Sequence, residues 1–244
     1  MTVTKDRKPM PDLDIEGIAA LADGGFWLAS EGNPEREKTK TRSSLIRVNA
    51  AGEVQQVVPL PDVLAAQANR FGFEGLAITG SGADQTLWIA VQREWKDDPK
   101  GFVRLLAYSP ATGGWGQVRY PLDAAGTGWV GLSEITAVPG GFVFIERDNL
   151  TGPQARLKQL TFVPSTEFKA VALDAKDVPV VRKSKLRDLL PDLLKGKGYI
   201  HDKVEGFAVD KEGNAYLVTD NDGADGTSGE TVFLNLGKLA IPPR

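Results

Sequence analysis

A strand–turn–strand unit that begins with glutamate recurs along this chain and is the feature that most constrains its fold. In each copy two short apolar runs flank a glycine-containing turn, which is typical of a β-hairpin. Both runs are almost continuously apolar, which indicates strands covered on both faces. The copies, roughly 60 to 70 residues apart, begin at Glu16, Glu74, Glu134 and Glu205.

Further strand-like segments follow each hairpin, so one period holds about four strands, the content of a propeller blade. The sequence therefore predicts an all-β fold of the β-propeller class, with about four visible four-stranded blades. A larger, six-bladed parent is left open. The predicted units lie within a single domain, 1–244, and span residues 14–60, 73–122, 131–173 and 204–240.

Two segments interrupt this rhythm. The loop 32–43 is rich in charge and is interpreted as a solvated surface loop. A short amphipathic helix is predicted at about 184–196, with Ser184 as its cap and a break at Pro191. Phe168–Leu173 is expected to form the last strand of the third unit.

Composition narrows the functional classes. The net charge is −3 and no basic block is present, so nothing indicates a nucleic-acid partner. The absence of cysteine excludes disulfides, cysteine-bound zinc and cysteine nucleophiles. No apolar run reaches membrane-spanning length, and the N-terminus shows no signal peptide. An open array of blades would expose apolar faces, and self-association is expected in that case.

The first strand of each propeller blade lines the central channel, so the four repeat-initial glutamates are expected near one of its mouths. Carboxylates that close repel one another unless protons or a cation neutralise them. Ca²⁺ suits such a site, because it accepts about six to eight oxygen ligands in tolerant geometry. We therefore expect a divalent metal, Ca²⁺ first, at Glu16, Glu74, Glu134 and Glu205. The alternative is structural: each glutamate accepts backbone N–H groups of the adjacent blade.

Polar residues also end the second strand of each hairpin, away from the turn and therefore near the first glutamates. Arginine binds phosphate oxygens in pairs of hydrogen bonds, and carboxylates can hold a metal or move a proton. The candidates for catalysis are Glu31, Glu146, Asp220 and the sole histidine, His201. The candidates for binding an anionic ligand are Arg70, Arg93, Arg147 and Lys203. Charge balance within the protein is the alternative for the arginines, and a loop position is the alternative for the histidine.

Two further motifs bear on the expected chemistry. The segment from Asp220 to Gly226 contains acidic residues and glycines, but its twelfth position is Thr231, so an EF-hand is excluded and a plain turn is expected. No Gly-x-Ser-x-Gly motif is present, which disfavours serine-esterase chemistry.

Several longer motifs carry a family resemblance. They are Asp14-Ile15-Glu16-Gly17-Ile18-Ala19 with Ser30-Glu31-Gly32, Asn69-Arg70-Phe71-Gly72-Phe73-Glu74-Gly75-Leu76-Ala77, Ile145-Glu146-Arg147-Asp148, and Val204-Glu205-Gly206-Phe207 with Thr219-Asp220-Asn221-Asp222. Together they resemble the phytase-like, or esterase-like phytase, domain of bacteria, over residues 12 to 236. The resemblance implies a β-propeller, usually of an exported protein, and thus a periplasmic or secreted location.

The sequence departs from the family pattern at its N-terminus, and the resemblance also implies a function. Family members usually begin with an additional Gly-Leu-Ser-Gly-Leu-like segment and a strand ending in Ser-Asp-Asp, and nothing before Asp12 matches. One or two N-terminal blades are therefore expected to be missing. The expected function is metal-assisted hydrolysis of a small phosphorylated or other anionic ester. A lactonase-type metal-dependent hydrolase and a non-catalytic propeller that binds a ligand or partner are the alternatives.

Overall fold

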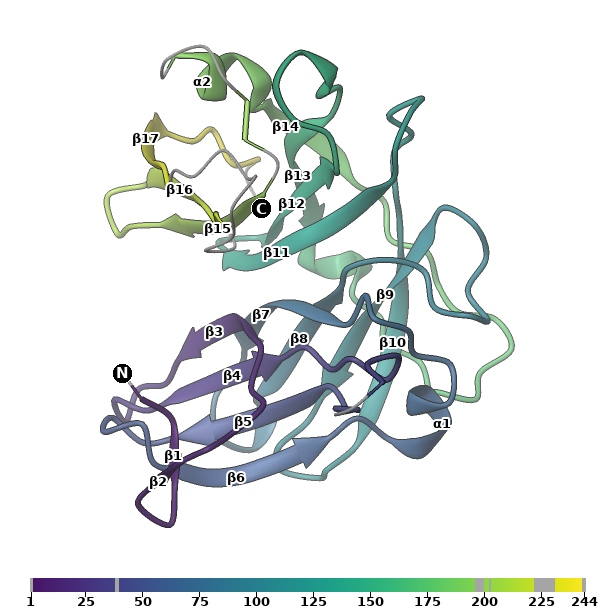
Figure 1. The fold of residues 1–244 in the computed structure, drawn as a ribbon, viewed down its shortest axis with the longest axis vertical. Helices are drawn as coiled ribbons and strands as arrows, with labels where there is room; N and C mark the ends of the chain where they lie inside the picture. The colour runs from purple at the N-terminus through teal and green to yellow at the C-terminus, as the bar shows by residue number, and fades with distance from the viewer. Residues whose placement is uncertain (1, 38–39, 196–199, 202, 222–230, 243–244) are drawn as a thin grey trace. The chain divides into compact units, whose positions relative to one another are not determined.

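The structure is a computed structural model that describes residues 2–37, 40–195, 200–201, 203–221 and 231–242. Its main sheets are antiparallel, and each contains strands that follow one another in the chain (Figure 1). This confirms the predicted all-β fold of the β-propeller class, with four blade sheets. The chain divides into unit 1, Met1–Arg119 with Ala170–Pro179, and unit 2, Tyr120–Lys169 with Val180–Arg244.

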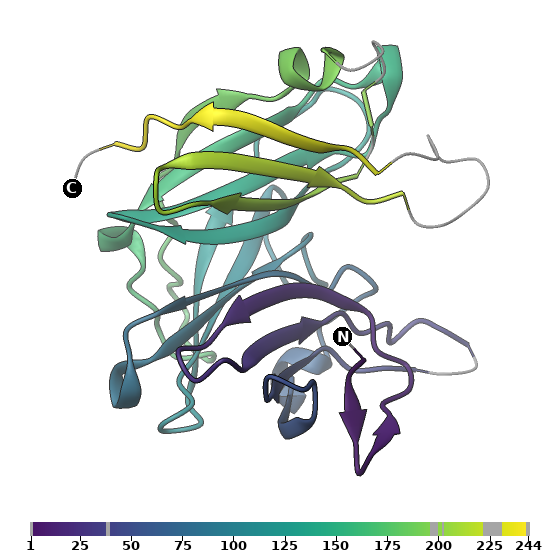
Figure 2. The ribbon, with the colours of Figure 1, turned by 90° about the vertical axis from the view of Figure 1, so that its left-hand side faces the viewer.

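Unit 1 contains two four-stranded sheets and a small hairpin. The first sheet consists of β3 (Ile15–Ala20), β4 (Phe26–Ser30), β5 (Ser44–Val48) and β6 (Val54–Pro59). The second consists of β7 (Phe73–Thr79), β8 (Thr86–Val91), β9 (Phe102–Tyr108) and β10 (Trp115–Pro121), and the helix α1 (Asp62–Ala65) precedes it. The hairpin of β1 (Thr4–Lys5) and β2 (Lys8–Pro9) is seen most clearly in Figure 2.

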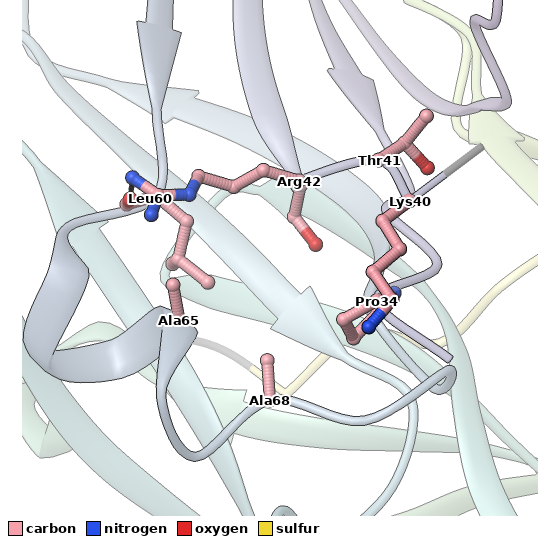
Figure 3. A pocket seen from close by; sticks show the side chains of 8 residues that line it. Pro34, Lys40, Thr41, Arg42, Leu60, Ala65 and Ala68 are labelled. Carbon is pink, nitrogen blue, oxygen red and sulfur yellow. Dashed lines mark hydrogen bonds between the residues drawn. The ribbon is translucent and has the colours of Figure 1, made fainter. Parts of the chain in front are cut away.

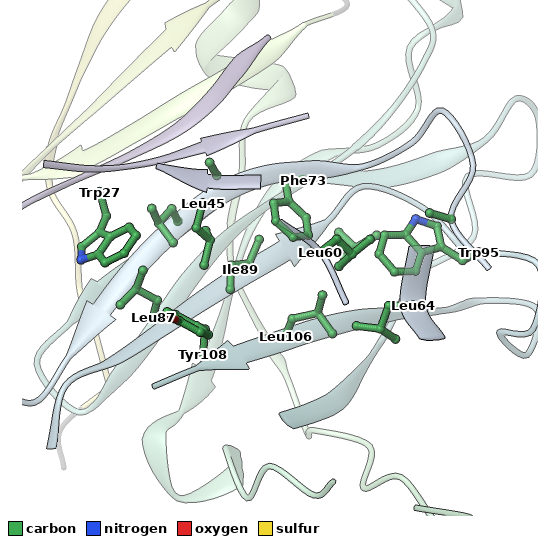
Figure 4. Close-up of a cluster of buried hydrophobic side chains, with 14 residues drawn as sticks. Trp27, Leu45, Leu60, Leu64, Phe73, Leu87, Ile89, Trp95, Leu106 and Tyr108 are labelled. Atoms are coloured by element: carbon green, nitrogen blue, oxygen red, sulfur yellow. The ribbon is translucent and has the colours of Figure 1, made fainter. Parts of the chain in front are cut away.

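The core of unit 1 explains why its strands are apolar on both faces. Trp27 and Leu45 of the first sheet pack with Ile89 of the second (Figure 4). The alternate residues Leu28 and Ile46 face the other way and are covered by the N-terminal segment through Val3, Met10 and Leu13. Successive side chains of a strand point to opposite faces, so a strand that is packed on both faces requires a nearly continuous apolar run.

Unit 2 contains a four-stranded sheet and a sheet with three strands among the described residues. The first consists of β11 (Val130–Val138), β12 (Gly141–Asp148), β13 (Lys158–Pro164) and β14 (Ser184–Asp188). The second consists of β15 (Val204–Val209), β16 (Asn214–Thr219) and β17 (Phe233–Lys238). Short 3₁₀ turns occur at Gly82–Asp84, Gly152–Gln154 and Ser165–Glu167.

The predicted helix at 184–196 is largely wrong. Ser184–Asp188 forms β14 and pairs with β13, because hydrogen bonding to that sheet edge outweighs the local helical pattern. Only Leu190–Leu194 is helical, as α2, and Pro191 stands at its start, where no backbone N–H is needed. No helix within the described residues is long and apolar enough to cross a membrane.

The predicted strand at Phe168–Leu173 is also wrong. Because β14 occupies the edge of β13, this segment has no place in the third sheet. Within unit 1, Val171 forms a single bridge with Gln117, and Leu173 packs against the core of that unit. The third sheet therefore ends at Asp188 instead of residue 173.

A β-bulge lies close to the repeated glutamate in the first strand of each of the four blade sheets. Register shifts occur between Ile15 and Gly17, Phe73 and Leu76, Leu132 and Glu134, and Val204 and Gly206. A bulge bends its strand and redirects one side chain. In β3 and β15 the glutamate itself is the bulged residue without a cross-strand partner, whereas in β11 this residue is Ser133 and Glu134 pairs with Ile145.

Candidate functional site

Three carboxylates of unit 1 form an acidic cluster. One oxygen each from Asp14, Glu16 and Glu31 lies within 4.8 Å of the other two. Asp14 and Glu16 flank the start of β3, and Glu31 directly follows β4. The hairpin joins these strands at their far ends, so the sequence positions 16 and 31 become neighbours in space. Asp14 is exposed and the two glutamates are half-buried, so the cluster is open to solvent on one side.

Backbone hydrogen bonds hold the cluster together. The N–H of Glu31 donates to the carbonyl oxygen of Asp14 at 2.7 Å, and the N–H of Asp14 donates to Oγ of Ser30 at 3.2 Å. The N–H of Gly72 donates to Oε1 of Glu31 at 2.7 Å. A Cβ atom at Gly72 would lie only 2.9 Å from Cγ of Glu31, so glycine allows this close approach.

Two arginines are gathered next to this contact. The guanidinium carbons of Arg70 and Arg93 lie 4.7 and 5.0 Å from the centroid of the Phe71 ring. Phe71 immediately precedes Gly72, so Arg70 of this loop and Arg93, which follows β8, both lie near the segment that orients Glu31. Arg93 also lies 3.6 Å from a carboxylate oxygen of Glu94. Stacking on an aromatic face positions guanidinium groups that can bind an anion.

Glu74 has a different environment from Glu16. Its side chain is buried, and Nε2 of Gln92 donates to its Oε1. Gly17 packs so tightly on the backbone of Glu74 that a Cβ at position 17 would overlap the Glu74 carbonyl oxygen. Glu74 therefore lies at the packing contact between the two sheets of unit 1.

In unit 2, Glu205 and Arg147 form an ion pair. Nη2 of Arg147 lies 2.6 Å from Oε1 of Glu205, and Nε of Arg147 donates to Oγ of Ser133 at 2.7 Å. The Arg147 side chain is 2 % exposed. This matches the charge-balance alternative for Arg147, and its role in binding a ligand stays a prediction.

Glu134 is held as a structural contact between β11 and β15. Its Oε1 accepts the N–H of Ile135 at 2.8 Å, and the backbone of Phe207 also hydrogen-bonds to it. Burial raises the pKa of Glu134 to about 8, although both backbone hydrogen bonds act in the opposite direction. The role of Glu134 as a metal ligand stays a prediction.

Glu146 lies at the centre of a buried polar network in unit 2. Its carboxylate accepts hydrogen bonds from Tyr120 Oη at 2.9 Å, from Lys183 Nζ at 2.6 Å and from the N–H of Asp123. Nε2 of Gln159 adds a fourth at 3.3 Å. These partners orient the carboxylate firmly, and a catalytic role for Glu146 stays a prediction.

The remaining predicted site residues also belong to unit 2. His201 is buried, with 6 % of its surface exposed. Nζ of Lys203 lies 3.8 Å from Oδ2 of Asp220, and the N–H of Asp220 donates to the carbonyl oxygen of Lys203 at 2.9 Å. The acidic turn predicted beyond Asn221, which includes Asp222 and Asp225, lies outside the described residues.

The structure thus brings together the predicted residues Glu16 and Glu31, and separately Arg70 and Arg93. Glu16 and Glu74 belong to unit 1, whereas Glu134 and Glu205 belong to unit 2. Sequence reasoning missed Asp14 as a site residue. Its closeness in the sequence to Glu16 was a usable signal, because both residues lie at the start of β3, opposite the end of β4 that Glu31 follows.

The acidic cluster fits a hard divalent cation. Carboxylate oxygens suit Ca²⁺ and Mg²⁺. All three donors of this cluster are carboxylate oxygens, so it could hold either ion.

Fold and site together define a β-propeller protein with an acidic, oxygen-rich cluster. Residues 2–223 match the family described as "Phytase-like: Esterase-like activity of phytase". The match covers most of the chain, and the protein belongs to this phytase-like family. That description supports a propeller hydrolase in general and leaves the substrate open.

Other comparisons add little. No curated protein matches the chain significantly. Among solved structures, the chain is similar to the GH43 endo-arabinanase from Bacillus licheniformis, with 11 % sequence identity over 96 % of each chain and a TM-score of 0.30. A similarity this weak carries no argument about function.

Proposed function

We propose that this protein hydrolyses a small anionic ester, in the first place a phosphate monoester, with help from a divalent cation at the acidic cluster. The observation that carries the proposal is the junction at Phe71 and Gly72. Gly72 orients Glu31 of the cluster, and the guanidinium groups of Arg70 and Arg93 both lie near the ring of Phe71. Two adjacent residues of one loop therefore connect a carboxylate that suits a cation with arginines that suit an anion.

The chain's own residues divide the work. Asp14, Glu16 and Glu31 would hold the cation, and Ca²⁺ is the ion we propose. Such a cation supplies Lewis-acid polarisation of the ester and a water molecule of lowered pKa. Arg70 and Arg93 would bind the non-bridging oxygens of the ester and orient it, since planar guanidinium groups match phosphate geometry.

Substitution separates these roles. Isothermal titration of Ca²⁺ into chelator-treated protein should show saturable binding. Glu31→Gln should weaken it about tenfold or more, because one charged ligand is lost. Asp84→Asn removes an exposed carboxylate at the opposite end of a hairpin and should leave affinity unchanged. Absence of Ca²⁺ and Mg²⁺ binding in folded protein would refute the metal-assisted mechanism.

Hydrolysis then distinguishes the candidate functions. With metal bound, Arg93→Ala should raise KM for a phosphate monoester, because ground-state and transition-state binding of the anion are both lost. Hydrolysis of lactones that is insensitive to Arg93→Ala would favour the lactonase alternative. Ca²⁺ binding without any hydrolysis would favour a non-catalytic propeller that binds a ligand.

The location of the protein and its self-association are also proposals. A periplasmic or secreted location is proposed from the family, and fractionation of the source cells would check it. Self-association is proposed for a propeller that does not close, and sedimentation over a range of protein concentrations would check it.

A further inference from the structure

A cavity of about 260 Å³ lies in unit 1 (Figure 3). Its lining combines an apolar floor with two cations. The lining residues are Pro34, Lys40, Thr41, Arg42, Ser43, Leu60, Ala65 and Ala68. Known ligand pockets are also mainly apolar with a few polar groups, and most are larger, at about 300–1,000 Å³. The cavity therefore suits a small ligand.

The walls of the cavity are held in place by hydrogen bonds. The N–H of Leu60 donates to the carbonyl oxygen of Ser43 at 2.9 Å, and Nη1 of Arg42 donates to the carbonyl oxygen of Leu60 at 3.2 Å. Oγ1 of Thr41 accepts the N–H of Asn33 at 2.9 Å. A cavity that is already formed needs little ordering when a ligand binds, which favours affinity.

Helix α1 supplies the floor. Leu64 points into the core and is 1 % exposed, whereas Val63 is 58 % exposed on the outer side. Ala65 and Ala68, with short side chains, face the cavity from this segment (Figure 3). The small side chains leave the space, and a larger residue at position 65 would fill it.

One wall is shared with the acidic cluster. Oγ of Ser43 accepts the N–H of Gly32 at 3.2 Å, and Gly32 directly follows Glu31. A Cβ at Gly72 would lie 2.9 Å from both Oγ of Ser43 and Cγ of Glu31. Ser43 and Glu31 therefore flank the same glycine, and a ligand in the cavity would lie next to the proposed hydrolytic site.

We propose that this cavity binds the apolar part of a small anion, with Lys40 and Arg42 attracting its charge. The inference rests on the proposed function where it names a substrate class: amphipathic monoesters. Arg42 already forms an exposed ion pair with Asp62 at 2.8 Å, so much of its charge is balanced. A ligand with several phosphate groups would lose the water around them at the apolar floor, and the cavity has too few cations to compensate for this loss. The cavity therefore selects against polyanions.

Binding can be measured without turnover. Phenylphosphonate, which has no ester bond to cleave, should bind chelator-treated protein about tenfold more tightly than methylphosphonate in NMR titrations. Ala65→Phe should abolish this preference, because the new ring occupies the cavity. Val63→Phe adds the same ring to the outer side of the same helix and should preserve the preference. Lys40→Ala should weaken binding of both phosphonates.

The outcomes separate the two proposals. Equal affinity for the two phosphonates, or a preference that persists in Ala65→Phe, would overturn the cavity as the binding site. A preference that Ala65→Phe removes supports the cavity even if the protein hydrolyses no ester, in which case only the proposed function fails. If hydrolysis occurs, KM for phenyl phosphate should rise about tenfold in Ala65→Phe and stay unchanged in Val63→Phe.

Discussion

The buried ion pair between Lys158 and Asp148 offers a sharp test of how unit 2 is stabilised. Both side chains are 0 % exposed, and Nζ of Lys158 lies 2.9 Å from Oδ1 of Asp148. Nζ also donates to the backbone carbonyl oxygen of Asp148 at 2.6 Å. Replacement of Lys158 by methionine keeps the apolar stem and removes the charge, leaving a buried carboxylate without its cation.

Removing one partner of a buried pair costs about 3–5 kcal/mol of unfolding free energy. The lower end applies, because Asp148 still accepts backbone N–H groups of Arg156 at 2.6 Å and Leu157 at 2.8 Å. Burial alone would raise the pKa of Asp148, but Lys158 and these hydrogen bonds outweigh it and hold the pKa below its ordinary value. We therefore expect Lys158→Met to destabilise the protein by about 3 kcal/mol at pH 7.

Urea unfolding followed by tryptophan fluorescence would measure this loss as a lower midpoint with an unchanged m-value. Asp148→Asn serves as the second corner of a double-mutant cycle. In that background Lys158→Met should cost at least 1 kcal/mol less, because no carboxylate remains to be stranded. A loss below about 1 kcal/mol for Lys158→Met alone, or strict additivity with Asp148→Asn, would refute the reasoning.

Three further predictions concern other parts of the chain. Because folding raises the pKa of Glu134 from 4.5 to about 8, the folded state keeps a proton that the unfolded chain has lost between these values. The contribution of Glu134 to the free energy of unfolding is complete below pH 4.5 and should fall by about 1.4 kcal/mol per pH unit until pH 8. Glu134→Gln should remove this slope in urea titrations across the range. Gly72→Ala should displace Glu31 and lower Ca²⁺ affinity about tenfold in calorimetry, although no charge is lost; unchanged affinity would show that Glu31 is not a ligand. Trp27→Ala should lower the melting temperature and cost about 3–5 kcal/mol of unfolding free energy, because the side chain is 1 % exposed in the core of unit 1.

The amino-acid sequence by itself determined the hairpins and the class of fold. Apolar runs, turn glycines and the repeated glutamate are local signals, and they correctly predicted pairs such as β3 with β4 and β15 with β16. The two strands of a hairpin also lie side by side at the end away from the turn, so the sequence predicted that Glu31 lies near Glu16. These features follow from sequence because the interacting residues are close along the chain.

Long-range contacts decided the rest. The segment 184–188 carries a helical pattern but becomes a strand, since the edge of β13 supplies hydrogen-bond partners that no local pattern can reveal. Gly72 orients Glu31 from 41 residues away, and Lys183 reaches Glu146 from 37 residues away. The four repeated glutamates look alike in sequence. Their surroundings nevertheless differ: Glu16 lies in an acidic cluster and Glu74 accepts a hydrogen bond from Gln92. Glu205 pairs with Arg147, and burial raises the pKa of Glu134. These differences arise because the chemistry of a side chain is set by what packs against it.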